Sequence, residues 1–294
     1  MDIHVLFNGL GNQLSQYAFF LNKRRLGQRA WAYYAFGGHN GYELGRLFGI
    51  RQKLLWPMRA AWLLFRIGNS RRLWSKSLSD AVLGLLRVRI VFESPDYRFD
   101  PELLKPWFGL RFLVGGWHDA RYFGGAEQLV RDTFSFPELD ERNQMVQRRI
   151  EEAYSVSIHI RRGDYLSAEN RDLFGDIATV SYYRNAIAEA MAEVQAAGFT
   201  ARFFVFSDEI AWCREVLELP DAEFVNINAG TDSWKDLVLM SRCRINILAN
   251  STFSWWAAWL NRHPDKCVFC PTRFVSTALP GQTIYPATWR QIAG

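Results

Sequence analysis

Two adjacent arginines follow an apolar, β-branched run in the middle of the chain. Residues 156–160 predict a buried strand, and Arg161, Arg162, Gly163 and Asp164 come directly after it. A guanidinium stays charged at any relevant pH and binds phosphate through paired hydrogen bonds. Glycine lets the loop turn sharply or approach a ligand closely. We interpret this loop as an anion-binding site; the alternative is a surface arginine pair in a salt bridge with Asp164.

A second polar segment lies between a predicted strand, residues 245–249, and a helix. It reads Asn250, Ser251 and Thr252. Free N–H groups and hydroxyls at the start of a helix bind anions, although Ser and Thr also cap helices that bind no ligand. The spacing of the tryptophans in this helix favours core packing over stacking on a substrate. They are Trp255, Trp256 and Trp259.

Two further motifs predict no cofactor. The segment Gly9-Leu10-Gly11-Asn12-Gln13 follows a predicted strand, but a dinucleotide fingerprint needs a third glycine where Leu14 stands. No lysine-containing phosphate loop is present in the sequence. Cys267 and Cys270 have the spacing of a metal knuckle, but the other two cysteines form no second pair. We therefore expect neither NAD nor zinc, and no metal site.

The polar segments described above must be positioned by helices and strands. For these elements the sequence predicts an α/β fold. Alternating strands and helices favour parallel sheets with right-handed crossovers. Both halves begin with a strand that leads into a polar or glycine-rich loop. We expect two Rossmann-like domains that face each other across a cleft, residues 1–150 and 151–294, joined in the charged stretch 138–152. The expected strands are 3–7, 112–114, 156–160, 203–206, 224–227, 245–249 and 267–270. The expected helices are 12–26, 181–197, 210–217, 236–243 and one capped by Ser251 or Thr252.

Composition excludes several classes of protein. The chain has 294 residues, of which 49% are hydrophobic and 22% charged, so global disorder is excluded. Four cysteines are too few for a disulfide scaffold. No apolar run is long enough to predict a membrane-spanning helix. The first residues lack the pattern of a signal peptide, so we expect a cytoplasmic protein.

The positive charge is concentrated in one segment. The 35 basic and 30 acidic residues give +5 overall. Residues 51–92 hold nine basic residues and one Asp, a net +8, which leaves −3 for the rest of the chain. The segment also carries Trp56, Trp62, Phe65 and Trp74. We predict peripheral contact with an anionic membrane through residues 51–92; the alternative is a solvated basic face of the acceptor domain.

Motifs along most of the chain resemble the α-1,2-fucosyltransferase family, in its bacterial-type soluble form. They are Gly9-Leu10-Gly11-Asn12-Gln13-Leu14, Gln16-Tyr17-Ala18-Phe19, His159-Ile160-Arg161-Arg162-Gly163-Asp164-Tyr165, Phe206-Ser207-Asp208, Asp236-Leu237 and Asn250-Ser251-Thr252-Phe253-Ser254-Trp255-Trp256. The resemblance implies an inverting, metal-independent GT-B glycosyltransferase that uses GDP-L-fucose.

The resemblance also implies roles for individual residues. Arg161 is expected to clamp the β-phosphate, and Asp164 is the candidate general base. The expected donor-binding residues are Asn12, Gln13, His159, Arg162, Asp208, Asp236, Asn250, Ser251 and Thr252. Among them, Asp236 would accept hydrogen bonds from guanine. On the acceptor side, His118 and Glu169 are further candidates.

The resulting interpretation is a galactoside α-1,2-fucosyltransferase. It would transfer fucose to the 2-hydroxyl of a terminal galactose, on an acceptor that is lipid-linked or part of a surface polysaccharide, at the inner face of the cytoplasmic membrane. Three alternatives remain. The first is a transferase that also uses GDP-fucose but makes another linkage or uses another acceptor. The second is a glycan- or nucleotide-binding protein without turnover. The third is a nucleic-acid binder, which rests only on the basic isoelectric point and the aromatic residues, so no nucleic-acid partner is expected.

Overall fold

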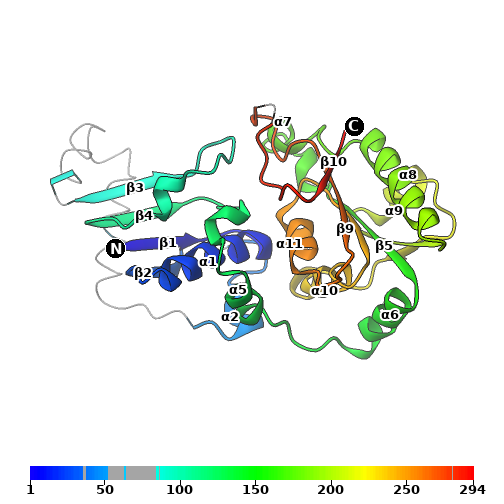
Figure 1. The fold of residues 1–294 in the computed structure, drawn as a ribbon, viewed down its shortest axis with the longest axis horizontal. Coiled ribbons are helices and arrows are strands. Elements are labelled where there is room, and N and C mark those ends of the chain that lie inside the picture. The colour runs from blue at the N-terminus through cyan, green and yellow to red at the C-terminus, as the bar shows by residue number, and fades with distance from the viewer. Residues whose placement is uncertain (36–37, 52–62, 64–83, 86, 280) are drawn as a thin grey trace. The chain divides into compact units, whose positions relative to one another are not determined.

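The computed structural model describes residues 1–35, 38–51, 63, 84–85, 87–279 and 281–294. The chain divides into two compact units (Figure 1). Unit 1 comprises Met1–Ser94 and Phe99–Ser135, and unit 2 comprises Pro95–Arg98 and Phe136–Gly294. The division therefore lies earlier than the expected boundary at residue 150. Helix α6 (Glu141–Glu152) crosses that position and belongs to unit 2, because its Arg149 pairs with Glu223 at 2.7 Å.

Unit 1 is built on a four-stranded parallel sheet in the order β2-β1-β4-β3. The strands are β1 (Asp2–Leu6), β2 (Ala30–Tyr34), β3 (Val88–Phe92) and β4 (Leu110–Val114). The helices are α1 (Leu10–Arg25), α2 (Glu43–Phe48) and α5 (Glu127–Thr133), with 3₁₀ turns η1 (Pro101–Leu104) and η2 (Ala120–Phe123). The expected first strand and first helix are confirmed. Gly27 follows the helix at φ 71°, a left-handed conformation that ends helices.

A buried ionic cluster fixes the amino ends of β1 and β4. Asp2 accepts hydrogen bonds from Arg111 Nε and Nη2 at 2.9 and 2.8 Å, and Lys23 Nζ lies 2.9 Å from the same carboxylate. Both cations also donate to the carbonyl of Leu103. Because every charge has a partner, the cluster holds α1, β1, β4 and η1 together at a position far along the strands from their carboxyl ends.

Unit 2 contains a six-stranded parallel sheet in the order β10-β9-β8-β5-β6-β7. The strands are β5 (Tyr154–Ile160), β6 (Ala201–Ser207), β7 (Glu223–Val225), β8 (Ile245–Ile247), β9 (Cys267–Pro271) and β10 (Arg290–Ile292). The main helices are α6, α7 (Arg171–Phe174), α8 (Val180–Ala196), α9 (Ile210–Val216), α10 (Trp234–Met240) and α11 (Thr252–Leu260), with short turns η3 (Asp164–Leu166) and η4 (Gly230–Asp232). The strands predicted in this half are confirmed to within a few residues.

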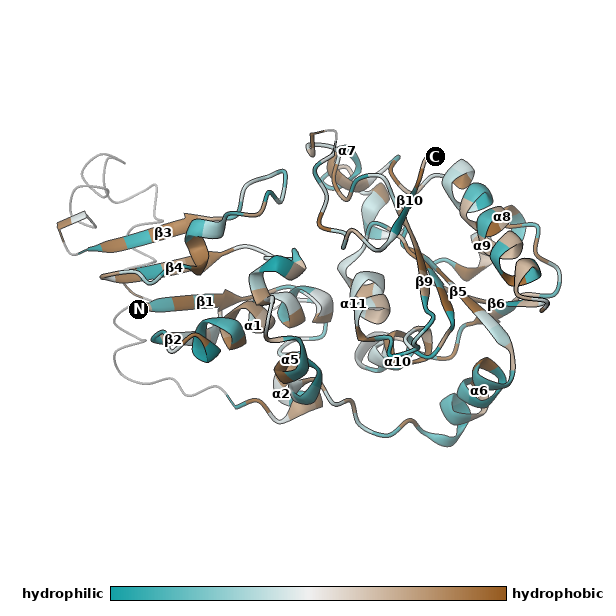
Figure 2. Cartoon of the chain, viewed as in Figure 1, coloured by the Kyte–Doolittle hydropathy of each residue, from teal (hydrophilic) through white to brown (hydrophobic). Residues whose placement is uncertain are grey.

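Helix caps and the core of unit 2 refine the sequence interpretation. Helix α8 is capped by Thr179, whose hydroxyl accepts from the N–H of Tyr182 at 3.1 Å; the expected cap, Ser181, lies inside the helix. Ser251 caps α11, as one of the two expectations had it. The three tryptophans of α11 are buried, which confirms core packing. Figure 2 shows the strands of unit 2 largely hydrophobic and α6 largely hydrophilic, as expected for a covered sheet and a solvent-facing helix.

Strand order determines where each unit can bind a ligand. In unit 2 the chain builds outward from β5 through β6 and β7, then returns to β8 on the other side of β5. In unit 1 the corresponding reversal lies between β1 and β4. Parallel sheets of this kind bind ligands beyond the carboxyl ends of their strands at this switch point. The loops after β5 and β8 are therefore the first candidates.

Two findings concern the membrane prediction. Within the described ranges, no helix has the combined length and apolarity needed to cross a bilayer. Most of the basic segment 51–92, including Trp56, Trp62, Phe65 and Trp74, lies outside the described residues, so the prediction for it stays open. Its described end is a strand, β3, which is not among the strands expected from the sequence.

Candidate active site

The arginine loop after β5 is held by carboxylates on both sides. Arg161 Nε donates to Asp164 Oδ1 at 2.7 Å, and its Nη1 lies 3.4 Å from Asp208 Oδ2. Burial works against the charge of Arg161, but these two carboxylates outweigh it and raise the guanidinium pKa. Arg162 pairs with Glu209 at 3.1 Å and stacks 4.2 Å from the ring centroid of Trp212. The loop is thus a charged and ordered structure before any ligand binds.

Asp208, at the end of β6, organises the backbone of this loop. Its two oxygens accept the N–H groups of Arg162 and Gly163, both at 3.1 Å. A Cβ at position 163 would lie 3.0 Å from Asp208 Oδ2, so glycine permits the close approach. Asp208 was expected to face the nucleotide, but its carboxylate is occupied by the loop. Its contacts make it a group that positions Arg161.

His159 lies one residue inside the strand, with its ring beside α11. It is buried, its ring centroid is 5.6 Å from that of Phe253, and burial with the nearby Arg161 charge lowers its pKa to about 3. The imidazole is therefore neutral. Its Nδ1 has no hydrogen-bond partner among the described residues. A buried ring nitrogen without a partner is costly, so this atom is available to a ligand.

The start of α11 is tied to the arginine loop by Tyr165. The Tyr165 hydroxyl donates to the carbonyl of Asn250 at 3.0 Å, and Arg161 lies 6.0 Å from the Tyr165 ring centroid. The side chain of Asn250 donates to the carbonyls of Phe174 and Phe274, so its amide holds two loops and does not point to a donor site. Ser251 accepts from the N–H of Phe253 at 3.3 Å, and Thr252 is half-buried beside it.

Asp236 belongs to a polar network on the first turn of α10. Asn228 donates to its carboxylate at 2.6 Å and also forms a reciprocal amide pair with Asn143 of α6. Burial raises the pKa of the Asp236 carboxyl to about 7, although the Asn228 hydrogen bond opposes the shift. Its side chain is only partly covered in the described structure. It can therefore accept further hydrogen bonds, most effectively when ionised.

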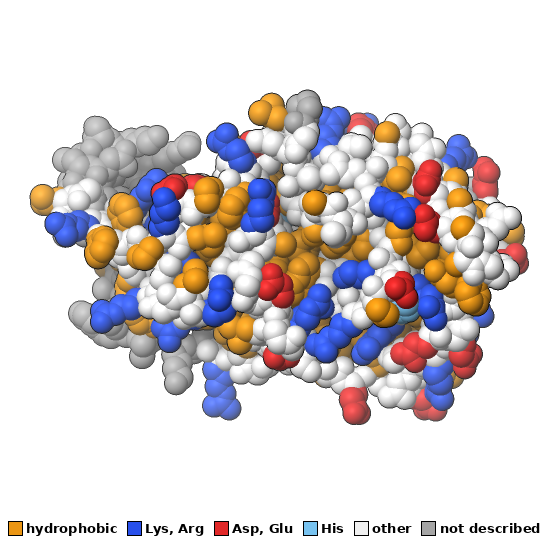
Figure 3. Space-filling view, in the orientation of Figure 1, with side chains coloured by type: hydrophobic (Ala, Val, Ile, Leu, Met, Phe, Trp, Pro, Cys, Tyr) orange, Lys and Arg blue, Asp and Glu red, His pale blue; other side chains and the backbone are white. Residues whose placement is uncertain are grey.

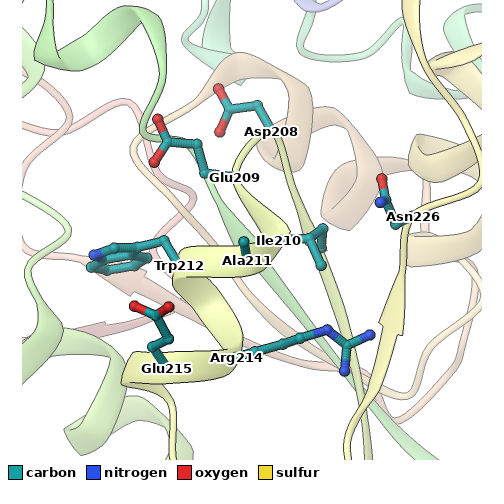
Figure 4. A pocket seen from close by; sticks show the side chains of 8 residues that line it. All are labelled: Asp208, Glu209, Ile210, Ala211, Trp212, Arg214, Glu215 and Asn226. Atoms are coloured by element: carbon teal, nitrogen blue, oxygen red, sulfur yellow. The ribbon is translucent and has the colours of Figure 1, made fainter.

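Two hollows adjoin the loop. One of about 660 Å³ lies over α9 and is shown in Figure 4, where Glu209, Trp212 and Glu215 project from the segment around α9 and Asn226 extends from the strand beyond. Three of its lining residues are carboxylates, which disfavours an anion. A smaller cavity of about 280 Å³ is lined by Arg161 and Arg162 together with Tyr165, Thr179 and Asn250. The larger hollow has one arginine, Arg214, beside its three carboxylates, whereas the smaller cavity has two arginines and a single carboxylate, and so suits an anionic group better.

In unit 1, side chains at the switch point form hydrogen bonds to the backbone of the same unit. Gln13 donates to the carbonyls of Asn8 and Gly41 and accepts from the N–H groups of Glu43 and Leu44. All of its hydrogen-bonding positions are thus used by the protein, so the expected direct donor contact is not supported. Asn12, one residue earlier, is half-buried, and its side chain has no hydrogen bond to another described residue. Asn12 is therefore the better candidate of the two.

Two residues that sequence reasoning missed close this switch point. Gln16 accepts from the N–H of Phe7 at 3.0 Å and donates to the carbonyl of Gly115 at 3.0 Å, which joins the ends of β1 and β4. Glu93 accepts from the N–H groups of Gly116 and Trp117 at 2.6 and 3.0 Å. Burial raises the pKa of Glu93 to about 7 despite these hydrogen bonds. Gln16 stood in a quoted motif; no sequence pattern pointed to Glu93.

The two acceptor candidates lie in contrasting surroundings. His118 is buried, its Nδ1 lies 3.0 Å from Ser15 Oγ, and burial lowers its pKa to about 3. The ring lies close to Gly116 inside unit 1, and its contact with an acceptor stays a prediction. Glu169 is exposed in the loop that follows η3. No group of three His, Cys, Asp or Glu side chains suited to a metal ion occurs in the described part of the chain.

The two parallel sheets, each with polar loops at the carboxyl ends of its strands, define an α/β protein. The chain belongs to glycosyl transferase family 11, whose family model matches residues 112–293. It is 38% identical over 125 residues to the O-antigen biosynthesis glycosyltransferase WbnK of Escherichia coli, covering 42% of this chain and 40% of that protein. It is 32% identical over 162 residues to an alpha-1,2-colitosyltransferase of Escherichia coli, covering 54% of each.

Two further comparisons extend the similarity. The chain is 31% identical over 149 residues to galactoside alpha-(1,2)-fucosyltransferase 1 of Saimiri boliviensis boliviensis, covering 47% of this chain and 40% of that protein. The NodZ alpha-1,6-fucosyltransferase, in a crystal soaked with GDP-fucose, is similar with a TM-score of 0.50 and 15% identity over 88% of this chain and 91% of that one. The match to NodZ supports the fold alone. The matched part spans about half the length of the three curated relatives or less.

Proposed function

We propose that this chain transfers L-fucose from GDP-L-fucose to the 2-hydroxyl of a terminal galactose, with inversion and without a metal ion. Membership of family 11 and the names of two relatives support the transfer and its 1,2 linkage. The observation that carries the proposal is the position of Arg161 and of the start of α11, both at the switch point of unit 2. There Arg161 follows β5 and the start of α11 follows the neighbouring β8. Tyr165 donates a hydrogen bond to Asn250 before α11, and its ring centroid lies 6.0 Å from the Arg161 guanidinium.

We also propose that the two units act as the two Rossmann-like domains of a GT-B enzyme, with a cleft between them. Each unit has a parallel sheet with a switch point and polar loops at its carboxyl edge. The similarity to NodZ extends over most of the chain and so over both units. In this arrangement unit 2 holds GDP, and Asn12 of unit 1 reaches the sugar or the diphosphate.

The chemistry follows from where charge develops. As the bond from fucose C1 to the β-phosphate oxygen breaks, negative charge grows on the leaving GDP. Arg161 and the hydroxyls and N–H groups at Ser251 and Thr252 would neutralise it in place of a cation. The acceptor 2-hydroxyl attacks C1 from the opposite face, and its proton passes to a carboxylate, for which Asp164 is the candidate. Since Asp164 pairs with Arg161 in the free protein, a bound phosphate that engages the arginine would release Asp164 for this role.

The nucleotide would be recognised by Asp236 and His159. A carboxylate accepts two hydrogen bonds from the guanine N1–H and exocyclic amine, which explains a preference for GDP. The His159 Nδ1, which has no hydrogen-bond partner among the described residues, would bind the nucleotide. Arg162, which pairs with Glu209 and stacks on Trp212, would hold the loop in place through these two contacts.

A second candidate keeps the linkage and changes the donor. One relative is named as an alpha-1,2-colitosyltransferase, so this chain would transfer colitose from its nucleotide in place of fucose. A colitosyl donor differs from a fucosyl donor in the sugar, and none of the residues discussed for the nucleotide separates the two sugars. Only a direct comparison of GDP-fucose and GDP-colitose turnover decides between the two candidates.

The test is an activity assay on the purified chain. GDP-fucose and a panel of β-galactosides are incubated with the protein, and the product linkage is assigned by NMR. We expect α-1,2-fucosylated galactose, turnover that persists in EDTA, and a loss of at least about a hundredfold in Arg161→Ala. Arg148→Ala, on the exposed face of α6, is the matched control and should retain full turnover. Loss of turnover in EDTA would contradict the metal-free mechanism.

Thermal stability separates this proposal from the non-enzymatic alternatives. We expect GDP to raise the melting temperature while UDP and ADP do not, because Asp236 selects guanine. A nucleic-acid binder would instead show strongly salt-dependent binding to duplex or single strands. A binding protein without turnover would respond to GDP but yield no product with any acceptor.

We place the acceptor on a lipid carrier or a growing surface polysaccharide, and the protein at the inner face of the cytoplasmic membrane. The name of the WbnK relative, an O-antigen biosynthesis glycosyltransferase, supports a polysaccharide acceptor. Membrane contact would bring the protein to such acceptors. A membrane-bound fraction in which most of the transferase activity sediments with the membranes would support this location.

A further inference from the structure

An aromatic loop projects from the amino edge of the sheet in unit 1, opposite to the edge that carries the polar loops. Residues 105–108, Lys105, Pro106, Trp107 and Phe108, are all exposed, and Phe108 is 88% exposed. Leu85, two residues before the Arg87 that precedes β3, is 87% exposed. Large apolar side chains that are exposed next to one another, as Trp107 and Phe108 are, are typical of an interaction surface.

The loop is fixed, so its exposure is not the result of a loose chain. The amino group of Met1 donates to the carbonyls of Trp107 and Gly109 at 3.2 and 2.6 Å. The N–H of Leu110 donates to the carbonyl of Arg87 at 2.9 Å. Gly109 has φ 150°, and a Cβ there would lie 2.3 Å from that carbonyl, so only glycine permits this turn. The aromatic pair is held outward by the end of the sheet.

Positive charge surrounds these aromatic side chains. Arg29, Arg87 and Arg89 are exposed next to the amino ends of β2 and β3, and Arg89 lies 5.6 Å from the ring centroid of Trp107. Helix α1 ends at the same edge with Arg24 and Arg25 exposed. Among the described acids at this edge, Glu102 is paired with Lys105 at 2.6 Å and the buried Asp2 is paired with Lys23 and Arg111. Figure 3 shows basic and hydrophobic side chains intermixed over this end of unit 1.

We propose that this surface, formed by Arg29, Arg87, Arg89, Trp107 and Phe108, docks unit 1 on an anionic lipid bilayer. Arginines attract the negatively charged headgroups, and Trp and Phe enter the interface, where apolar area is removed from water. The exposed Phe108 and Leu85 favour a lipid surface over a nucleic acid, which offers no apolar layer. Because strands of five residues span about 17 Å, the carboxyl edge of the sheet would stand about that far above the surface.

The inference does not depend on the donor or the linkage. It concerns only described residues of unit 1 and adds a defined surface to the broader expectation for segment 51–92. It is testable without a glycosyl acceptor, so its failure and the failure of the proposed function are distinguishable: vesicle binding tests the surface, and GDP-fucose turnover tests the site.

The experiment is flotation of the full chain with vesicles of phosphatidylcholine alone or with added phosphatidylglycerol. We expect binding that grows with the anionic lipid fraction. Trp107→Ala/Phe108→Ala should lower the partition coefficient about tenfold. Arg29→Gln/Arg89→Gln should lower it about thirtyfold, since each basic residue near the surface contributes roughly one kcal/mol. An unchanged melting temperature without any ligand shows that each variant is folded.

Matched substitutions in unit 2 provide the controls. Met191→Ala/Phe199→Ala removes two exposed apolar side chains, 51% and 61% accessible, and Arg142→Gln/Arg148→Gln removes two exposed charges of α6. Both should leave vesicle binding unchanged. Binding that is independent of anionic lipid, or equal loss in the unit 1 and unit 2 variants, would overturn the proposal. So would strong binding to nucleic acid or self-association with no binding to vesicles.

Discussion

At the scale of single residues, the Arg161 side chain is held by ion pairs with carboxylates, which a ligand can replace. Arg161 and its carboxylate partners are between a quarter and two-fifths exposed, so solvent screens the pairs and each contributes little to stability. A diphosphate carries more charge than one carboxylate and matches the guanidinium fork. The exchange of Asp164 for phosphate therefore costs little, while the backbone stays fixed by Asp208.

The first prediction concerns Asp208 as the residue that positions the loop. Asp208→Asn retains the shape but replaces one acceptor with an NH₂ group that faces a backbone N–H. We expect turnover to fall at least about tenfold, with weaker GDP binding, and unfolding free energy to fall by about 1–2 kcal/mol. Glu209→Gln, which loses only the exposed pair with Arg162, should cost less than about 1 kcal/mol. Equal effects of the two substitutions, measured by denaturant unfolding and steady-state kinetics, would refute the positioning role.

A second prediction follows from the raised pKa of Asp236, about 7. Guanine binds the ionised carboxylate, so GDP affinity should rise about tenfold from pH 6 to pH 8, as the ionised fraction rises from about one tenth to nine tenths. The folded protein holds this proton more tightly than the unfolded chain, so the stability contributed by the group is lost as pH rises through 7. Calorimetric titration of GDP checks the affinity. In Asp236→Asn the pH dependence should vanish, and UDP should show none in either protein.

The sequence predicted the identity of most candidate residues but not the direction of their side chains. Arg161, Ser251 and Asp236 all lie in unit 2 at or near its carboxyl edge, as the motifs indicated. Asp208 and Gln13 bind backbone groups of other segments, because N–H and C=O groups in nearby loops need partners that a linear sequence does not reveal. Glu93 meets Gly116 and Trp117 only once β3 and β4 pair, so no local pattern marks it.

At the scale of elements, buried strands were predicted best. The run in β5 is continuous and apolar or small, as expected for a strand covered on both faces, and β6 is similar. Strand β3 was missed because its basic flanks resemble an amphipathic helix, and β10 because three residues carry too little pattern. The start of α8 was misplaced since Thr179 and Ser181 are both good caps, and only the hydrogen bond to Tyr182 distinguishes them.

The prediction at this scale concerns the start of α11. Ser251 caps the helix, so Ser251→Ala should cost about 1 kcal/mol of unfolding free energy. If the same hydroxyl holds a phosphate oxygen, the GDP-induced melting shift should shrink as well. Ser251→Thr keeps the hydroxyl and should restore most of both. A normal GDP shift in a destabilised Ser251→Ala protein would assign the hydroxyl to capping alone; denaturant titration with and without GDP measures both quantities.

At the scale of the whole molecule, the two units divide the tasks that the proposed reaction needs. Unit 2 has the cationic loop, the helix start and Asp236, which together suit a nucleotide diphosphate. Unit 1 satisfies its switch point with Gln13, Gln16 and Glu93 and leaves Asn12 for a ligand. A substitution in unit 1 should therefore be able to lower sugar transfer without weakening nucleotide binding, even though both depend on one chain.

The last prediction tests this division with two neighbouring residues of α1. Asn12→Ala should leave both the melting temperature and its shift with GDP unchanged, while turnover falls at least about tenfold, because misplacement of the sugar affects the transition state far more than nucleotide affinity. Gln13→Ala removes four contacts to the backbone and should lower the unfolding free energy by about 1–3 kcal/mol. Scanning fluorimetry and initial rates distinguish the two. If Asn12→Ala instead abolished the GDP shift, nucleotide binding would not belong to unit 2 alone; if its turnover were normal, unit 1 would not contact the reacting sugar through Asn12.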